Sequence, residues 1–514
     1  MQPSVLLNSL SSHAACYRDK VRSVKMVFLP SSDKDLIVKV LEEAGVCAKC
    51  CKRFIGEKAP IDYYQIHVVE SESQQDEKRV KVNPCVACLG VLQYSYMVPK
   101  LDEVVSSIIN CGYDAEKFSL SLSLPICLAL RQHSLLVHLT SRLPASVVSG
   151  IESEDIVPIK QAWKYIYPDL VAKKVSLEHL NGEKTDFFTE LQVEWSNDNS
   201  ELSCMTILCK EEYATRAKNI HVYNMGVFSR LGIEKSLTGV TSEEFSKNYP
   251  VPPSVPTESF QLSMKMFRNP LFIGGRYCKY DRELPQTPWL INGVRMRETS
   301  IEEIIAEKIN TVVKASELKF LASGREDVDV RMLGNGRPFA FECVNPKKTK
   351  FSKDELLVLE QLVNNHHDGI VINSLQIVSK EDIKNLKEGE EQKRKKYTAL
   401  CVTSESCPDD KFDKLSRMVD VRLDQETPIR VLHRRANAVR QKVVHSMKVE
   451  KEGLVNNMFK LLVTTSAGTY VKEFVHGDFN RTKPNVASLL GCDTDILALD
   501  VEEVELNWPP KKCG

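Results

Sequence analysis

Apolar residues recur at helical spacing in several parts of the chain. Between the capping candidates Ser31–Asp33 and Gly45, leucine, isoleucine and valine return every three or four residues, which predicts a helix over residues 31–45. A capping box at Ser300–Glu303 opens a second strongly apolar helical pattern that continues to Val313. Shorter helical patterns are predicted at residues 104–109, 159–167 (between Pro158 and Pro168), 214–219, 222–231 and 354–362.

Other segments have the period of a β-strand. Serine alternates with leucine or phenylalanine over Phe118–Leu124, which predicts a half-buried strand. Similar signals predict strands at residues 338–344, 370–378 and 397–402, and a loop or the start of a strand at 269–281. The second half of the chain therefore reads as α+β with many short strands, and the first half as a mixed module.

A proline-rich segment divides the two halves. Residues 250–256 hold four prolines in seven positions, too many for a helix or a central strand. We expect a linker at 250–256 between a domain at 27–249 and a domain at 257–514. Residues 1–26 are expected to be a disordered extension, with a transit peptide as the alternative because the segment is serine-rich and poor in acid.

Composition sets limits on class and surroundings. The 514 residues are 42% hydrophobic and 27% charged, as in ordinary globular proteins, and the formal net charge is zero. Any surface for nucleic acid must therefore be local. The most apolar segment, Phe118–Leu139, is broken by Pro125 and Arg131, so no membrane span is expected. Sixteen scattered cysteines and no secretory signal favour a reducing, intracellular location in the nucleus, the cytoplasm or both, with an organelle as the alternative.

Four of the cysteines have metal-ligand spacing. They form two CxxC pairs, Cys47 with Cys50 and Cys85 with Cys88, inside a window of 42 residues. Tetrahedral zinc takes four thiolates in this way, and such a closed site is structural because it leaves no position for water. We expect one structural zinc ion; chance pairing or a redox dithiol is the alternative. Cys51 is interpreted as a bystander.

Positive charge is concentrated in one stretch. Residues 427–449 contain no acidic side chain and carry Arg430, His433, Arg434, Arg435 and Arg440. Because arginine grips phosphates, this pattern favours contact with nucleic acid over the more usual solvated surface. The mixed-charge segment 387–396 is interpreted as an exposed loop.

A charged run follows an apolar patch in the second half. In Gly324-Arg-Glu-Asp-Val-Asp-Val-Arg331 a glycine and Arg325 precede Asp327, and Asp329 comes two residues later. A Gly-Asn-Gly turn is predicted at 334–336. In an extended loop the two aspartates point to the same side, so either could serve as a catalytic carboxylate.

These segments together resemble the archaeal and eukaryotic pseudouridine synthases that modify uridines 54 and 55 in the T arm of tRNA. The resemblance covers nearly the whole chain beyond Met26 and depends on the order of the motifs rather than on any one of them. The motifs are the two CxxC pairs, 272–277 (FIGGRY), 324–331 (GREDVDVR), 334–339 (GNGRPF), 395–397 (KKY), 427–435 (TPIRVLHRR) and 466–472 (SAGTYVK).

The resemblance implies roles for individual residues. Asp327 matches the catalytic aspartate, with Asp329 as its rival. Tyr397 matches the tyrosine that stacks on the target base, and Lys472 the basic residue that pairs with the aspartate. Leu499 matches a late apolar pocket residue, although an ordinary core leucine is the simpler interpretation. Arg325 and the bases of 427–449 are expected to contact RNA.

The resemblance also implies the architecture and the partners. We expect an α+β protein with a zinc-binding, THUMP-containing accessory domain and a C-terminal catalytic domain built on a central mixed or antiparallel sheet. Its substrate would be tRNA, held at the T arm and at the acceptor end, with other structured RNAs as further candidate substrates. No organic cofactor, no membrane and a monomeric state are expected.

Two rival functions remain at this point. A non-catalytic, zinc-containing RNA-binding or scaffold protein would need the basic stretch but not Asp327, Tyr397 and Lys472 together. A zinc hydrolase would need histidine or carboxylate ligands around an open metal position, and the sequence has no HExxH-like spacing.

Overall fold

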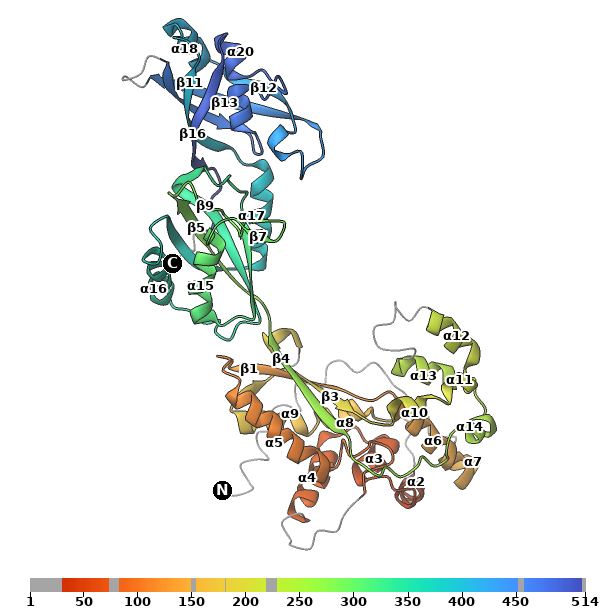
Figure 1. The fold of residues 1–514 in the computed structure, drawn as a ribbon. Coiled ribbons are helices and arrows are strands. Elements are labelled where there is room, and N and C mark those ends of the chain that lie inside the picture. The colour runs from red at the N-terminus through yellow and green to blue at the C-terminus, as the bar shows by residue number, and fades with distance from the viewer. Residues whose placement is uncertain are drawn as a thin grey trace. The chain divides into compact units, whose positions relative to one another are not determined.

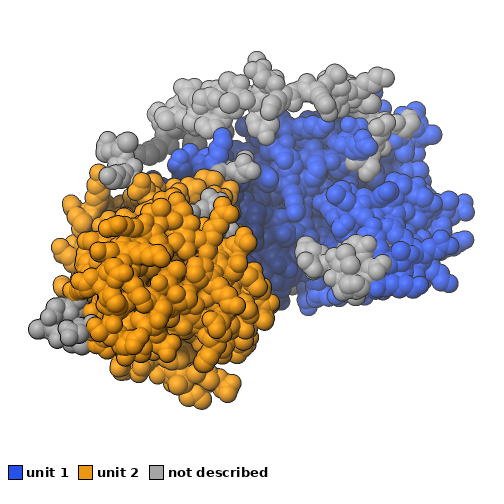
Figure 2. Space-filling model, turned by 90° about the horizontal axis from the view of Figure 1, so that it is seen from above, with its two compact units in different colours: residues 1–111, 115–266 blue, residues 112–114, 267–514 orange. Residues whose placement is uncertain are grey.

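The computed structural model of the protein describes residues 30–73, 83–148, 154–180, 182–218, 229–451 and 457–510. The chain forms two compact units, coloured separately in Figure 2: residues 1–111 with 115–266, and residues 112–114 with 267–514. The extension predicted at 1–26 lies outside the described residues. The domain boundaries predicted around 250–256 stay a prediction.

The first unit combines helices with a four-stranded sheet of order β2-β1-β3-β4 (Figure 1). Its strands are β1 (Lys117–Ser123), β2 (Glu178–His179), β3 (Phe187–Glu194) and β4 (Gln261–Arg268). Its helices are α2 (Ser31–Glu43), α3 (Ala48–Phe54), α4 (Pro60–Ser73), α5 (Tyr94–Asn110), α6 (Cys127–Arg142), α7 (Ala145–Val148), α8 (Ile159–Lys164), α9 (Tyr167–Val175), α10 (Asp198–Leu202), α11 (Met205–Leu208), α12 (Lys210–Lys218), α13 (Arg230–Leu237) and α14 (Ser242–Asn248).

Local patterns explain much of this unit. The predicted first helix is α2, which buries Ile37 and Leu41. The predicted strand is β1, whose buried and exposed residues alternate and which pairs in parallel with β3. The end predicted for the helix at 159–167 is wrong, because α8 stops at Lys164. Pro168 lies instead in the first turn of α9, where a backbone N–H would have no partner within the helix. Most of the segment predicted as a helix at 222–231 lies outside the described residues.

The second unit is built on a large mixed sheet, as the α+β prediction required. Among the described residues it has ten strands in the order β10-β5-β9-β16-β11-β14-β13-β12-β15, with β8 paired to β9. Its strands are β5 (Leu271–Lys279), β8 (Glu317–Ala322), β9 (Arg331–Val344), β10 (Ile370–Val378), β11 (Lys395–Thr403), β12 (Val419–Glu426), β13 (Val439–Lys451), β14 (Met458–Thr465), β15 (Thr482–Lys483) and β16 (Thr494–Val504). A separate hairpin joins β6 (Leu290–Ile291) to β7 (Val294–Arg295).

Helices cover both faces of one half of this sheet. Phe339 and Phe341 of β9 belong to the main core with residues of α15 (Ile301–Val313) and α16 (Lys353–Asn364), whereas Ala340 between them packs with α17 (Lys380–Gln392). This alternation follows from the two-residue period of a strand, and Figure 1 shows α17 across the sheet from α15 and α16. The remaining helices are α18 (Asp409–Ser416), α19 (Val471–His476) and α20 (Val486–Leu490), with a 3₁₀ turn at Ile429–Val431.

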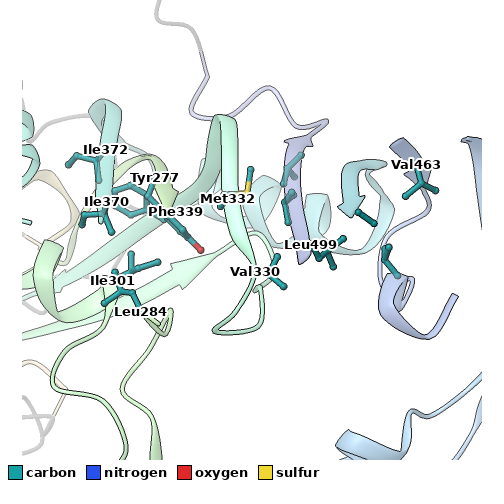
Figure 3. Packing of buried hydrophobic residues seen from close by; sticks show 14 of the residues in the cluster. Tyr277, Leu284, Ile301, Val330, Met332, Phe339, Ile370, Ile372, Val463 and Leu499 are labelled. Atoms are coloured by element: carbon teal, nitrogen blue, oxygen red, sulfur yellow. The ribbon is translucent and has the colours of Figure 1, made fainter. Parts of the chain in front are cut away.

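The main core is continuous through the second unit. Figure 3 shows part of it, from Ile370 and Ile372 on β10 to Val463 on β14 and Leu499 on β16. The capping box predicted for α15 is present in part, since the hydroxyl oxygen of Ser300 accepts a hydrogen bond from the Glu303 N–H. This packing fixes the strands from which the candidate site is built.

Two local predictions for the second unit were wrong. Residues 334–336 are not a turn but part of β9, where Gly334 and Gly336 have φ values of 59° and 78°. A Cβ on Gly334 would lie 2.1 Å from the Glu502 carbonyl oxygen, so a neighbouring strand requires the glycine. Residues 387–396 are not a loop, because they span the end of α17 and the start of β11.

None of the helices in the described ranges is both long and apolar enough to cross a membrane.

Candidate active site

A pocket of about 580 Å³ opens in the second unit where four elements meet. The loop between β8 and β9 supplies Asp327, β11 supplies Tyr397, α19 supplies Lys472, and β16 supplies Leu499. Pockets of this size are typical of small-molecule sites. Four residues singled out from the sequence, separated by up to 172 positions (499 minus 327), therefore line one cavity.

Strand pairing positions the apolar wall of the pocket. On adjacent strands, Tyr397 pairs with Val501 and Ala399 pairs with Leu499. Side chains of paired residues lie on the same face, and residues two apart on a strand share a face, so these four side chains lie together. Leu499 is 7% exposed and belongs both to the main core and to the pocket lining. The core interpretation and the pocket interpretation of Leu499 are thus compatible.

The two candidate aspartates have different surroundings. Asp327 lines the pocket, and its side chain is 34% exposed. Asp329 is absent from the lining, its side chain is 65% exposed, and its two carboxylate oxygens lie 2.9 and 2.7 Å from Nζ of Lys472. Burial raises the pKa of Asp329, but the hydrogen bonds and charge of Lys472 outweigh it and hold the pKa below its ordinary value.

The closest cation to Asp327 is one that we expected to bind RNA. Arg430 donates from Nη1 to Asp327 Oδ2 at 2.8 Å, whereas Lys472 Nζ lies 3.6 Å from the same oxygen. Arg430 also donates from Nε to Glu473 at 2.6 Å, and the Glu473 side chain is 2% exposed. The guanidinium thus links a buried carboxylate to the pocket carboxylate. Lys472 contacts both aspartates and lies nearer to Asp329.

Buried side chains hold the backbone of the Asp327 loop from behind. Lys279, fully buried on β5, donates from Nζ to the carbonyl oxygens of Asp327 (3.2 Å), Val328 (2.7 Å) and Leu284 (3.0 Å). Burial lowers the pKa of Lys279 below its ordinary value. Three carbonyl acceptors around one ammonium therefore fix the path of the chain at the aspartate.

An ion pair braces the residue before Asp327. Arg337 donates from Nε to Glu326 at 2.7 Å, and both side chains are 1% exposed. Arg337 also donates from Nη1 to the Ser323 carbonyl at 2.8 Å, and the Tyr277 hydroxyl donates to Glu326 at 2.8 Å. The amide of Gln286 donates to the Tyr277 hydroxyl and to the Gly324 carbonyl. The loop is held rigidly by groups on β5 and β9.

Sequence reasoning missed this support. Tyr277 and Arg337 stand inside quoted motifs, yet nothing in the sequence indicated that they meet. Their contact follows from the pairing of β5 with β9, in which Tyr277 and Arg337 are register partners. Predicting it would have required the strand register. Lys279 continues the same strand two residues later and could have been found as a lysine on a buried strand.

Tyr397 provides a neutral ring in the pocket. Burial raises its pKa to about 12, with Arg337 lowering it and Glu326 raising it. The phenol therefore stays protonated near neutral pH. A ring in this state can stack on a base without adding charge beside Asp327.

The predicted RNA-contacting residues fall into two groups. Arg325, Arg434 and Arg435 are exposed and line the pocket mouth, and His433 is exposed on the same loop between β12 and β13. Arg440 instead donates to the Thr427 hydroxyl at 2.8 Å at the base of that loop. The acid-free segment is thus a loop at the pocket, followed by strand β13. Contact with RNA stays a prediction for all of them.

The first unit brings the four cysteines together. The Sγ atoms of Cys47, Cys50, Cys85 and Cys88 all lie within 4.8 Å of one another, and three of the residues are buried. Four sulfurs about 2.3 Å from one ion would stand about 3.8 Å apart, and Cys47 and Cys88 are separated by 4.0 Å. The cluster could therefore hold a metal ion. Cys51 turns away, with its sulfur 3.8 Å from the Val46 carbonyl oxygen.

Other donors face the same sulfurs. Arg53, which is 1% exposed, donates from Nη1 to Cys50 Sγ at 3.5 Å, and the Cys47 N–H donates to Cys85 Sγ at 3.2 Å. Donors of this kind stabilise thiolates, which are the ligand form of cysteine.

Comparisons with known proteins agree with this arrangement. The family described as "Pus10, C-terminal" matches residues 272–505, and "Eukaryotic Pus10, N-terminal" matches residues 85–264. The chain is 38% identical over 436 residues to the human tRNA pseudouridine synthase Pus10, covering 84% of this chain and 80% of that protein. It is 34% identical over 514 residues to the protein of the same name from Xenopus laevis, covering 92% and 97%.

An archaeal relative matches a smaller part. The tRNA pseudouridine synthase Pus10 of Thermofilum pendens is 34% identical over 276 residues, covering 53% of this chain and 61% of that protein. Among solved structures, a Cbf5-Nop10-Gar1 complex aligns with 44% of this chain and 47% of its own at 16% identity and a TM-score of 0.25, too low to support an argument.

Proposed function

The chain belongs to the Pus10 family of tRNA pseudouridine synthases, and we propose that Asp327 is its catalytic aspartate and a T-arm uridine its target. The observation that carries the assignment is the shared pocket: Asp327, Tyr397, Lys472 and Leu499 line one cavity. Asp329 competes poorly for the role because it is outside the lining and is paired with Lys472. A decayed, non-catalytic domain would not need to keep all four side chains in one place.

The reaction is an isomerisation that needs no external reagent. The bond between N1 of uracil and C1′ of ribose breaks, the base turns, and a bond between C5 and C1′ replaces it. The proton lost from C5 balances the one gained at N1. Asp327 acts either as the nucleophile or as a base at the ribose, and both roles require its ionised form.

The pocket suits a base that has left its helical stack. Extracting a uridine costs a few kcal/mol, which stacking and phosphate contacts must offset. We assign the stacking to the neutral ring of Tyr397 over the apolar wall that includes Leu499. The exposed Arg325, Arg434 and Arg435 at the mouth are placed to contact the phosphates on either side.

Arg430 occupies a defined position beside Asp327 in the absence of RNA. Its contacts to Asp327 and Glu473 place a positive charge against the catalytic carboxylate before RNA arrives. A phosphate entering the pocket would compete for the same guanidinium. We propose that Arg430 both orients the Asp327 carboxylate and contacts RNA.

For the first unit we propose an accessory role. The donor set of four cysteines fits a single zinc ion, which would stabilise the fold between residues 47 and 88 and take no part in the reaction. The THUMP assignment of this unit, its contact with the acceptor end of tRNA, a monomeric state and a location in the nucleus or cytoplasm belong to the same proposal. Uridine 54, uridine 55 or both are the proposed targets.

Substitution of the two aspartates tests the central assignment. Asp327→Ala should abolish pseudouridine formation on a T-arm-containing tRNA transcript while leaving tRNA affinity nearly unchanged. Asp329→Ala is the matched control and should keep measurable activity, because this side chain does not line the pocket. The assignment would be reversed if Asp327→Ala formed pseudouridine at the full rate, or if only Asp329→Ala lost this activity.

A further inference from the structure

Phe479 is the most exposed large apolar side chain among the described residues, at 90%. It stands in the middle of three consecutive residues in the left-handed region, with φ of 47° at Asp478, 56° at Phe479 and 66° at Asn480. Non-glycine residues adopt this conformation at an energetic cost and keep it where the surroundings enforce it. The backbone of this segment thus exposes an apolar ring to solvent, which is unfavourable unless a partner covers it.

The surrounding contacts make the Phe479 segment rigid. Thr482 N–H donates to the Gly477 carbonyl, and Arg481 N–H to the Asp478 carbonyl, both at 3.1 Å. Gly477 ends α19, and β15 begins at Thr482, where it pairs with β12. The segment is therefore closed on both sides by regular structure, and the backbone that carries Phe479 is held in a fixed place.

This segment is joined directly to the active-site loop. The Asp478 carboxylate accepts a hydrogen bond from the Ile429 N–H at 3.2 Å, and the next residue, Arg430, contacts Asp327. Lys472 lies on the same helix that leads to Phe479. Four helical residues rise about 6 Å and three more residues span at most about 11 Å, so Phe479 lies within a few nucleotides' length of the pocket.

Charged groups of both signs lie around the Phe479 segment. The loop with the exposed Arg434 and Arg435 contacts this segment, because Arg481 donates from Nη2 to Asn437 Oδ1 at 2.9 Å. Phe479 itself lines a hollow together with Asp493 and Asp495. Those carboxylates would repel a phosphate but not a neutral base. The arrangement favours a nucleotide whose phosphate faces the arginines and whose base covers the phenyl ring.

We propose that Phe479 is a second stacking platform, which receives an unpaired RNA base a few nucleotides away from the target uridine. The inference rests on the proposed function, since it takes the RNA at the pocket to be tRNA. Every base offers a flat face to an aromatic ring, so the platform selects an unstacked nucleotide rather than a particular sequence. Because the backbone at Phe479 is already ordered, forming this contact costs no backbone entropy.

Equilibrium binding of a T-arm-containing tRNA to the full-length protein tests the platform. All measurements use the Asp327→Ala background, so that no turnover occurs. Phe479→Ala should raise the Kd about 5- to 150-fold, the range for losing one base–aromatic stack. Phe479→Trp should bind within about twofold of the parent because it keeps a stacking face. Leu357→Ala, which truncates a 54%-exposed apolar residue on α16, is the matched control and should change nothing.

A photocrosslinker at position 479 gives a readout that does not depend on affinity. With p-benzoylphenylalanine there, irradiation should attach the protein to one short segment of the tRNA. An unchanged Kd for Phe479→Ala, or a crosslink that reaches no RNA, would overturn the platform. Since these measurements concern binding, they stand apart from the activity test of Asp327, and either proposal can fail without the other.

Discussion

The ion pair behind the Asp327 loop gives a sharp test of how the site is held. Arg337→Met removes the guanidinium 2.7 Å from Glu326 and leaves that carboxylate, 1% exposed, with the Tyr277 hydroxyl as a donor. Breaking a buried ion pair by removing one partner costs about 3–5 kcal/mol. Because a folded domain is stable by only about 5–15 kcal/mol, the variant should lose a large part of its free energy of unfolding.

Hydrogen–deuterium exchange on the full-length chain can locate the loss. Peptides from β5 and β9 should lose protection equivalent to about 3–5 kcal/mol, and peptides from α2 and α5 serve as the internal reference. The rate of pseudouridine formation should fall as well, since Arg337 also holds the Ser323 carbonyl at the start of the loop.

A double variant separates charge from packing. In Glu326→Gln/Arg337→Met the side-chain oxygen that accepts from Tyr277 is kept while both charges are gone, so most of the lost protection should return. If the double variant is as unstable as Arg337→Met alone, the uncompensated charge is not the cause. Full protection in the single variant would refute the reasoning altogether.

Two further predictions concern the metal and the acid side of the stability curve. Elemental analysis of purified protein should find about one zinc per chain. Cys85→Ser should lose the zinc and lower the melting temperature, whereas Cys51→Ser should keep the zinc and the melting temperature of the parent. An empty site in the parent would contradict the assignment. Burial raises the pKa of Asp500, but hydrogen bonds and charge from Arg331 and Arg282 outweigh it and hold the pKa below its ordinary value. The stability from this group is present above the unfolded pKa of about 3.9 and is lost as pH falls through the lower folded value. Thermal melts from pH 7 to pH 3 should therefore show a shallower acid decline for Asp500→Asn than for the parent, and identical slopes would dismiss the contribution.

Regular local patterns explain which elements could be predicted. The strand at Ile370–Val378 has the predicted bounds, and the helix at 31–45 differs by two residues at its end, because alternation and capping are local signals. Gly334 and Gly336 were misread because a glycine with positive φ is equally at home in a turn and in a strand that a neighbour approaches closely. Only the pairing with distant strands distinguishes the two cases.

In the candidate site too, the residues could be predicted from the sequence but their contacts could not. Asp327, Tyr397, Lys472 and Leu499 were predicted from the family resemblance, and the structure places them around one pocket, while their roles stay a prediction. The partners of these residues could not be foreseen. That Arg430 rather than Lys472 lies closest to Asp327, or that Lys279 holds the loop from behind, depends on strand register and on a loop path that no neighbouring residue specifies.

The parallel pairing of β9 with β16 has a consequence for the character of the pocket. Arg331 pairs with Asp500 and Met332 with Val501. A slip of β16 by one residue would exchange its two faces, turning Leu499 away and bringing the Asp500 carboxylate toward the space beside Asp327. Arg282 and Arg331 both grip Asp500 on the opposite face. These two ion pairs therefore favour the observed register of β16. In that register the pocket presents an apolar wall to uracil and not a second carboxylate.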